Sequence, residues 1–386
     1  MIASPLQLYV HIPFCIHKCH YCDFNSHVRQ TPDWPAYQHA LIRELEHWSV
    51  QPQFQQRPLH SIFFGGGTPS LAPDSLIAAV LEKSEQLFTW TDAVEITLEA
   101  NPGTVDSSAF QSFYHAGINR LSMGVQSLDA GELQWLERIH NQEEVYRAFE
   151  CARAAGFDNI NLDLMYGLPK QSLAQWQSTL DAAIALDAEH LSCYQLTVEP
   201  HTKLAATHAI SPYALPDDET ALTFFHTTRQ RLAAAGYAAY EISNFAKPHK
   251  KCRHNDGYWL YHDYIGIGAG AAGKWDCEGG ETYRYSQRRS PEGYIQQAMR
   301  MGSAIHSDET LTRSEAAAEA LWVGLRRQEG VDDRWFEQRF GQSIMASFQT
   351  ELQPWLTSNH LTWHGSQLHL TAQGVPLADA IAAAVI

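Results

Sequence analysis

Short apolar runs alternate with longer amphipathic stretches through the first two thirds of the chain. Each short run ends at glycine, proline or a polar residue, which is typical of a buried strand, and each longer stretch repeats apolar residues with a helical period. The predicted strands are Leu8 to Ile12, Ser61 to Phe64, Val94 to Glu99, Arg120 to Val125, Ile160 to Met165 and Leu191 to Leu196. The predicted helices include Tyr37 to Trp48, Ser75 to Phe88, Glu143 to Ala155 and Leu173 to Leu186, with Asp74 and Asp106 as N-caps.

This alternation predicts parallel strands joined by right-handed crossovers. Six such units, rather than eight, predict an α/β fold built on a partial (β/α)6 barrel of the TIM type. The carboxyl ends of the strands in such a barrel open on one face, where ligand chemistry collects. We expect convergence there of the polar and glycine residues that follow the strands, at Cys15 to Cys22, Gly65 to Pro69, Glu99 to Pro102, Gln126 and Gly167 to Pro169.

The last third of the chain has a different organisation. A helix is predicted from Asp218 to Gly236, and the aromatic and glycine-rich stretch from Tyr237 to Trp275 is interpreted as extended segments and loops. From Leu311 onwards, helical stretches precede a predicted hairpin, an order that is typical of a winged-helix module. The predicted domains are therefore a barrel over 1–236, an extension over 237–309 and a winged-helix-like module over 310–386.

The composition and charge of the chain disfavour several classes of function. The 386 residues are 45% hydrophobic with a formal net charge of -16, which disfavours a generic binder of nucleic acid or of anionic membranes. The last module has five arginines and no lysine against eight carboxylates, so a DNA-binding wing is not expected. Met1 to Val10 lacks the features of a signal peptide, and no apolar run reaches the roughly 20 residues of a membrane span. We expect a cytosolic protein with at most peripheral contact at the inner face of the cytoplasmic membrane.

Three of the seven cysteines lie within eight residues, as Cys15, Cys19 and Cys22. In a chain expected to be cytosolic, such a group indicates metal binding before disulfides. Three thiolates on one short loop can hold three irons of a 4Fe-4S cluster and leave the fourth iron open. A zinc site remains an alternative, with a fourth ligand from His11, His17, His20 or Cys252.

Two further segments carry candidate chemistry, each beside a plain structural alternative. Gly65 to Pro69 follows the second strand, where missing Cβ atoms let a ligand approach the backbone, although a simple turn has the same composition. Glu99 ends the third strand with a carboxylate that can bind an amine or ribose hydroxyls, although an ordinary strand-end acid explains it equally well.

The cysteine loop after the first strand, with Tyr21 before the last cysteine, resembles the signature of the radical S-adenosylmethionine (SAM) superfamily. Longer strings resemble the oxygen-independent coproporphyrinogen oxidase family: Tyr9 to Cys15, Gly65 to Pro69, Asn101 to Thr104, Gly124 to Ser127, Arg138 to His140 and Asn161 to Pro169. The resemblance implies a 4Fe-4S cluster on the three cysteines and bound SAM, with Tyr21 near its adenine. The positions that it implies for cofactor contacts are Tyr9, Tyr21, Phe24, Gly66, Gly67, Thr68, Glu99, Gln126, Arg138 and Asp163. Arg138 is chemically suited to pair with the SAM carboxylate.

Three features resemble a branch of this family whose members act as haem-binding chaperones. Phe24 stands where the coproporphyrinogen dehydrogenases have an extra cysteine, and only Met1 to Gln7 precede the first strand, where those enzymes have an extension. His254 to Trp259 matches the branch's His-Asn-x-x-Tyr-Trp motif, which implies a haem ligand at His254 with Tyr258 and Trp259 as flat neighbours.

This resemblance implies haem binding and delivery of haem to respiratory haem proteins. The alternative is oxidative decarboxylation of coproporphyrinogen III by a 5′-deoxyadenosyl radical. Cys252 is a competing haem ligand, although a buried structural thiol explains it as well. The sequence leaves open whether the chain is a monomer or a homodimer.

Overall fold

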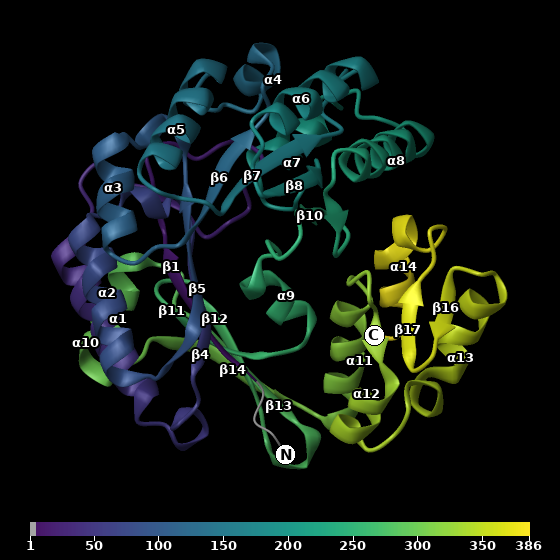
Figure 1. The fold of residues 1–386 in the computed structure, drawn as a ribbon. Coiled ribbons are helices and arrows are strands. Elements are labelled where there is room, and N and C mark those ends of the chain that lie inside the picture. The colour runs from purple at the N-terminus through teal and green to yellow at the C-terminus, as the bar shows by residue number, and fades with distance from the viewer. Residues whose placement is uncertain (1–4) are drawn as a thin grey trace.

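The computed structural model describes residues 5–386, so the part of the amino-terminal expectation that falls on residues 1–4 lies outside the described residues. All six predicted barrel strands are confirmed. They are β1 (Leu6–Ile12), β4 (Leu59–Gly66), β5 (Trp90–Ala100), β6 (Arg120–Gln126), β7 (Ile160–Tyr166) and β8 (His190–Gln195). They pair in this order and in parallel, which gives the expected partial barrel (Figure 1).

Helices follow the strands and cover the outside of the barrel (Figure 1). They are α1 (Trp34–Ser49), α2 (Asp74–Leu87), α3 (Ser107–His115), α4 (Ala130–Trp135), α5 (Gln142–Ala154), α6 (Leu173–Ala185), α7 (Lys203–Ile210) and α8 (Asp218–Ala234). Asp106 caps α3 as predicted, because its carboxylate accepts from the amide of Ala109 at 2.9 Å. The expectation that Asp74 caps α2 is wrong. The cap position is Pro73, and Asp74 is the first helical residue.

The sheet continues past the six strands at both edges, which the sequence did not predict. β11 (Asp263–Ile267) pairs in parallel with β1, followed by the antiparallel β12 (Ala272–Asp276), β13 (Thr282–Gln287) and β14 (Ile305–Leu311). β10 (Asn244–Ala246) and β9 (Ala238–Ala239) extend the β8 edge. Short β2 (Phe14–Cys15) and β3 (His27–Val28) pair beside the cysteine loop. The stretch expected to hold extended segments and loops also contains the helix α9 (Arg253–Trp259).

Segment 237–309 shares the core of the barrel. Ile265 and Tyr285 from its strands, and Tyr294 from α10 (Pro291–Met301), belong to the same buried cluster as Leu8 of β1 and Phe64 of β4. Parallel strands buried on both faces need such apolar cover on each side. The predicted division at residue 236 therefore does not separate two hydrophobic cores, and the domain boundaries stay a prediction.

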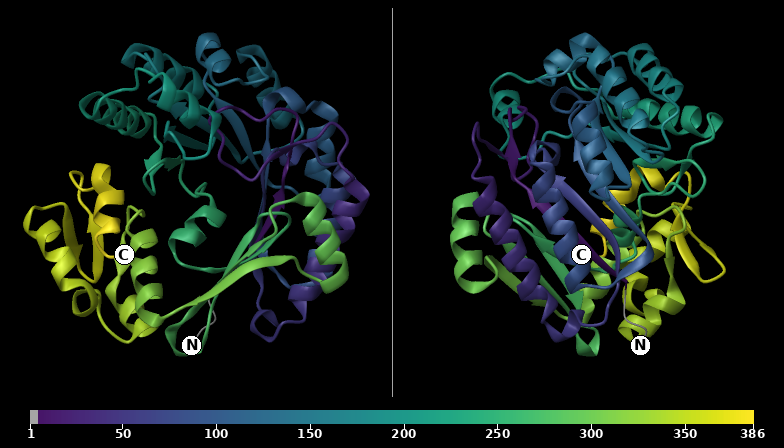
Figure 2. Two further views of the ribbon diagram at one scale, coloured as in Figure 1. Left: turned by 180° about the vertical axis from the view of Figure 1, so that it is seen from behind. Right: turned by 60° about the vertical axis from the view of Figure 1, so that its left-hand side comes forward.

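The C-terminal module has a core separate from that of the barrel, to which Tyr261 also contributes, and it lies beside the barrel in Figure 1 and in the left view of Figure 2. Its elements are α11 (Arg313–Gly324), β15 (Val331–Asp332), α12 (Asp333–Phe340), α13 (Ile344–Thr357), β16 (Leu361–His364), β17 (Gln367–Leu370) and α14 (Ala378–Ala383). Leu321, Phe336 and Leu352 pack with Leu368 of the hairpin, as the winged-helix pattern predicts. Among residues 5–386, no helix is both long and apolar enough to span a bilayer.

Candidate functional site

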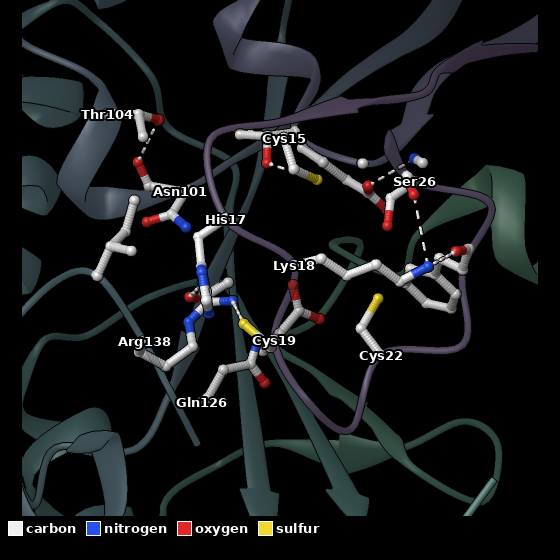
Figure 3. Close-up of a pocket in the computed structure, with 18 of the residues that line it drawn as sticks. Cys15, His17, Lys18, Cys19, Cys22, Ser26, Asn101, Thr104, Gln126 and Arg138 are labelled. Carbon is white, nitrogen blue, oxygen red and sulfur yellow. Dashed lines mark hydrogen bonds between the residues drawn. The ribbon is translucent and has the colours of Figure 1, made fainter. Parts of the chain in front are cut away.

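A cavity of about 340 Å³ opens at the carboxyl ends of the barrel strands, beneath the cysteine loop (Figure 3). This volume is within the roughly 300–1,000 Å³ that is usual for ligand pockets. The expected convergence on one cavity is confirmed for most of the candidate residues. Those that line it are Cys15, Cys19, Tyr21, Cys22, Phe24, Gly66, Gly67, Thr68, Glu99, Gln126, Arg138 and Asp163. Their roles in binding stay predictions.

The three cysteines are free thiols around this cavity. Cys15 is buried, and burial raises the pKa of the Cys15 and Cys22 thiols. Two donors face the sulfurs: the Thr68 hydroxyl lies 3.5 Å from Cys15 Sγ, and Arg138 Nη1 lies 3.7 Å from Cys19 Sγ. Since the thiolate is the metal ligand, such donors would stabilise the charge that a bound iron requires.

The donor set fits a cluster better than a single ion. Within the described part of the chain, no three His, Cys, Asp or Glu side chains converge on one ion. His11 is no spare zinc ligand, because Nδ1 pairs with the Tyr9 hydroxyl at 3.0 Å and Nε2 with the carbonyl oxygen of Asn25 at 2.9 Å. Cys252 is buried beside Glu95, outside the cavity wall. Three separated thiols on one loop suit the three irons of a cubane.

Glycine is required at two positions beside the cysteines. A Cβ on Gly67 would lie 2.9 Å from Cys15 Sγ and 2.7 Å from the carbonyl oxygen of Phe14. Gly66 has a φ of +121°, and a Cβ there would lie 2.7 Å from the His11 ring. The turn after β4 therefore lies against the cysteine loop in a way that no larger residue permits.

Gln126 occupies a strained backbone position at the end of β6. Its φ is +67°, and the register with β7 shifts between Gly124 and Gln126, as in a β-bulge. Such bulges redirect side chains at functional sites. Arg138 Nη2 donates to the carbonyl oxygen of Gly124 at 2.7 Å, and its buried Nε has no partner among the described residues. An arginine with an unused donor at a cavity wall fits an anionic ligand group.

Two carboxyl groups lie deep in the cavity. Burial, and then the charge of Asp163, raise the pKa of Glu99 to about 8, although its side chain accepts from the amide of Gly66 at 3.0 Å. Burial also raises the pKa of Asp163, which accepts from Ser122 at 2.9 Å and from Asn161 at 2.9 Å. Two neighbouring acids that resist ionisation together favour a cationic ligand, which would offset their charge.

Tyr9 does not line this cavity, so its expected contact with the same ligand stays an untested prediction. Its side chain points into the barrel, where its hydroxyl pairs with His11 and burial raises its pKa. A second, interior cavity of about 210 Å³ lies there, and Tyr9 lines it together with Arg120 and His254. Glu99 and Asp163 border both cavities.

The His-Asn-x-x-Tyr-Trp motif does not form one surface. His254 is buried, with Nδ1 2.8 Å from the Ser61 hydroxyl and Nε2 2.8 Å from the Tyr258 hydroxyl, and it stacks on Phe63. Trp259 lines a different cavity beside the C-terminal module. The reason is helical periodicity, since residues four apart share a face of α9 and the fifth residue turns away. The expected combination of a His254 ligand with a Trp259 surface is therefore wrong. Iron ligation by His254 stays a prediction that requires one of its two hydrogen bonds to break.

Comparison with known proteins agrees with this geometry. Residues 9–183 match the model of the radical SAM superfamily, and residues 311–377 match that of the HemN C-terminal domain. The heme chaperone HemW of Haemophilus influenzae is 39% identical over 374 residues, which cover 96% of this chain and 95% of the relative. The chain belongs to the HemW family. HemW of Escherichia coli is 44% identical over 294 residues, 76% of each chain.

A solved structure supports the fold of nearly the whole chain. HemN of Escherichia coli, described as a coproporphyrinogen III oxidase and a radical SAM enzyme, matches with a TM-score of 0.84 at 26% identity, over 99% of this chain and 90% of that one. The radical SAM match implies a 4Fe-4S cluster and SAM as cofactors of the family. The cavity described above is lined by the three cysteines and by ionic side chains, and their roles toward these two cofactors stay predictions.

Sequence reasoning missed several residues of the cavity wall. Ser122, Gly124 and Tyr194 line it, and all three lie within the predicted barrel strands; Asn101 also lines it, but it belongs to the strand-end segment Glu99 to Pro102 that was expected there. The strand-end rule did not select Tyr194, because this residue lies two positions before the end of its predicted strand. Ser122 and Gly124 lie within β6, where they alternate with apolar residues, so the two-residue period of a strand could have placed them on the same face as Gln126.

Proposed function

We propose that this chain is a haem chaperone that holds a 4Fe-4S cluster on Cys15, Cys19 and Cys22, binds SAM in the strand-end cavity, and passes haem to respiratory haem proteins. One observation carries the proposal: the three cysteines and the ionic residues meet around one cavity in a chain that resembles HemW over 96% of its length. Haem itself is the cargo.

Different residues of the cavity are suited to bind different groups of the SAM molecule. Glu99, with its raised pKa, suits the cationic amino group, and Arg138 with its unused Nε suits the carboxylate. Tyr21 lies on the cavity wall beside Cys22 and offers a ring face to the adenine. Gly66 and Gly67 let the ligand approach the backbone. A bound cluster would supply the electron that cleaves SAM.

The HemN likeness favours a second candidate, oxidative decarboxylation of coproporphyrinogen III. Phe24 argues against it. This side chain lies on the cavity wall, is 59% exposed, and stands where the resemblance places an extra cysteine in the dehydrogenases. A phenyl ring can neither ligate a metal nor carry a proton or a sulfur radical. The chain therefore lacks one reactive group that the decarboxylases have.

One experiment separates the two functions. Purified protein with an anaerobically reconstituted cluster is supplied with SAM and a reductant, and is assayed in parallel for protoporphyrinogen formation from coproporphyrinogen III and for haem uptake by its Soret absorbance. We expect stoichiometric haem uptake and no protoporphyrinogen. Conversion of coproporphyrinogen III over many turnovers would overturn the chaperone assignment, whatever the haem result.

Delivery at the inner face of the cytoplasmic membrane is proposed to go through the acceptor protein and not through lipid. The net charge of -16 repels the anionic lipids of that surface. We expect the haem-loaded protein to stay in the supernatant with vesicles of anionic lipid and to sediment with membranes that contain an acceptor. Sedimentation with the lipid vesicles alone would contradict this route.

A further inference from the structure

The largest of the cavities described here lies at the opposite end of the barrel from the cysteines. It encloses about 730 Å³ between the amino ends of the strands and the C-terminal module. Pro5 before β1 and Asp263 at the start of β11 line it from the barrel, and Gly324 and Trp335 line it from the module. Its volume lies in the upper part of the roughly 300–1,000 Å³ range of ligand pockets, as a tetrapyrrole requires.

Aromatic and apolar side chains form much of the wall. Trp259, Leu260 and Tyr261 come from the end of α9, and Val331 and Trp335 come from β15 and α12. The two walls are fixed relative to each other because α9 contacts α11 (Figure 1). Flat rings facing a cavity suit a flat apolar ligand.

One imidazole in this wall is available as a metal ligand. His262 is partly buried, and within residues 5–386 its ring nitrogens make no hydrogen bond. Burial, and then the charge of Lys274, lower its pKa to about 4, so the ring is neutral at physiological pH and has a free lone pair. His254 differs, because both of its nitrogens are already engaged.

Cys277 is the competing soft ligand in the same cavity. Burial raises its pKa, and the carboxylates of Glu281 and Asp276 raise it further. Because iron binds the thiolate, these acids disfavour Cys277 as a ligand. The imidazole needs no deprotonation and is therefore favoured.

The turn that carries His262 is fixed from inside by a buried lysine. Lys274 Nζ donates to the carbonyl oxygen of Tyr261 at 2.8 Å, and lies 3.4 Å from Asp263 Oδ1 and 3.3 Å from Asp276 Oδ1. It also lies 3.6 Å from the centre of the Tyr261 ring. A buried charge with this many partners fixes the geometry of the residues around it.

A cation for a carboxylate lies on the same wall. Arg339 Nη2 pairs with Asp276 at 2.7 Å, but its buried Nε has no partner in the described part of the chain. A guanidinium has five N–H donors, so the ion pair leaves donors for a second carboxylate. The cavity thus offers an axial ligand, flat rings and an anion contact together.

We propose that this cavity is where the haem cargo binds, with its iron on His262. The porphyrin lies between Trp259 and Trp335, and Arg339 receives one propionate. This inference rests on the haem binding proposed above and assigns it a place.

The location separates the cargo from the SAM chemistry. β1 has 7 residues, and a strand rises about 3.3 Å per residue, so its two ends lie roughly 20 Å apart. Haem at the amino end is thus out of reach of a radical formed at the carboxyl end. Haem binding should therefore not need the cluster.

The test is titration of the purified full-length protein with ferric haem, followed at the Soret band. His262→Ala should shift the band and weaken binding about tenfold or more, because apolar burial alone would remain. The matched variants His254→Ala and Cys277→Ser should keep the band and affinity of the wild type. Cys19→Ala, without a cluster, should bind haem as the wild type does.

A second variant, Trp335→Ala, tests the same cavity in case His262→Ala does not fold. It should weaken binding while leaving the Soret position unchanged, because the iron ligand remains. An unaltered band and affinity in His262→Ala, or a loss confined to His254→Ala, would overturn this placement. Absence of haem binding by the wild type would instead overturn the proposed function, so the two failures are distinguishable.

Discussion

Ionisation of Glu99 should make the folded protein less stable as the pH rises. The carboxyl group has a pKa of about 8 in the folded chain against an ordinary 4.5, because burial and Asp163 oppose its charge. Between those two values the folded state holds a proton that the unfolded state has lost, so stability falls with rising pH across this window. A pKa change of one is worth about 1.4 kcal/mol, which sets an upper bound of about 5 kcal/mol for the whole window. Because Glu99 is partly open to the cavity, we expect about 2–3 kcal/mol.

Glu99→Gln should remove this pH dependence. Urea unfolding followed by tryptophan fluorescence at pH 5, 7 and 9 should show the variant close to the wild type at pH 5 and more stable than it at pH 9. The exposed Glu85 on α2 provides the matched control, since Glu85→Gln should leave the profile unchanged. SAM should bind the wild type more tightly as the pH rises towards 8, and this gain should be absent in Glu99→Gln. Equal pH profiles for wild type and Glu99→Gln would refute the reasoning.

Three further predictions concern the same cavity. Cys19→Ala should lose the charge-transfer absorbance of the cluster and SAM cleavage together, whereas Cys151→Ala on α5 should keep both; a full cluster in Cys19→Ala would exclude the three-cysteine assignment. Gly67→Ala should prevent cluster assembly, because its Cβ would lie 2.9 Å from Cys15 Sγ. The iron content after reconstitution measures cluster assembly, and a normal iron content would show that the cysteine loop can move aside. Gln126→Gly should raise the free energy of unfolding by about 1 kcal/mol by relieving the positive φ, yet weaken SAM binding; lower stability would mean that no strain is stored there.

Much of the barrel could be predicted because each of its elements carries a local signal. β4 and β5 are apolar runs that end in glycine or a polar residue, and α5 and α6 repeat apolar residues with a helical period. The strand-end rule then placed Glu99 and Gln126 around one cavity without any knowledge of contacts, whereas Asp163, inside its strand, was selected only by the family resemblance. What failed was pairing between distant segments. β11 lies beside β1 although more than 250 residues separate them, and no local pattern reports such a partner.

The His-Asn-x-x-Tyr-Trp motif on α9 shows what helical periodicity alone can and cannot predict. Its spacing alone puts His254 and Tyr258 on one face and Trp259 on another, so a helix could have been expected to divide the motif. The sequence did not reveal that the stretch is a helix, because Asp256 and Gly257 in its middle are poor helix formers. Contacts from other elements hold it instead. The backbone amides of Arg253 and His254 donate to the Glu95 carboxylate, and the side-chain Nε2 of Gln7 donates to the carbonyl oxygen of His254. These bonds point the face of α9 that carries His254 and Tyr258 into the barrel. The face that carries Trp259 therefore points to the C-terminal module, and Trp259 lines the same cavity as His262.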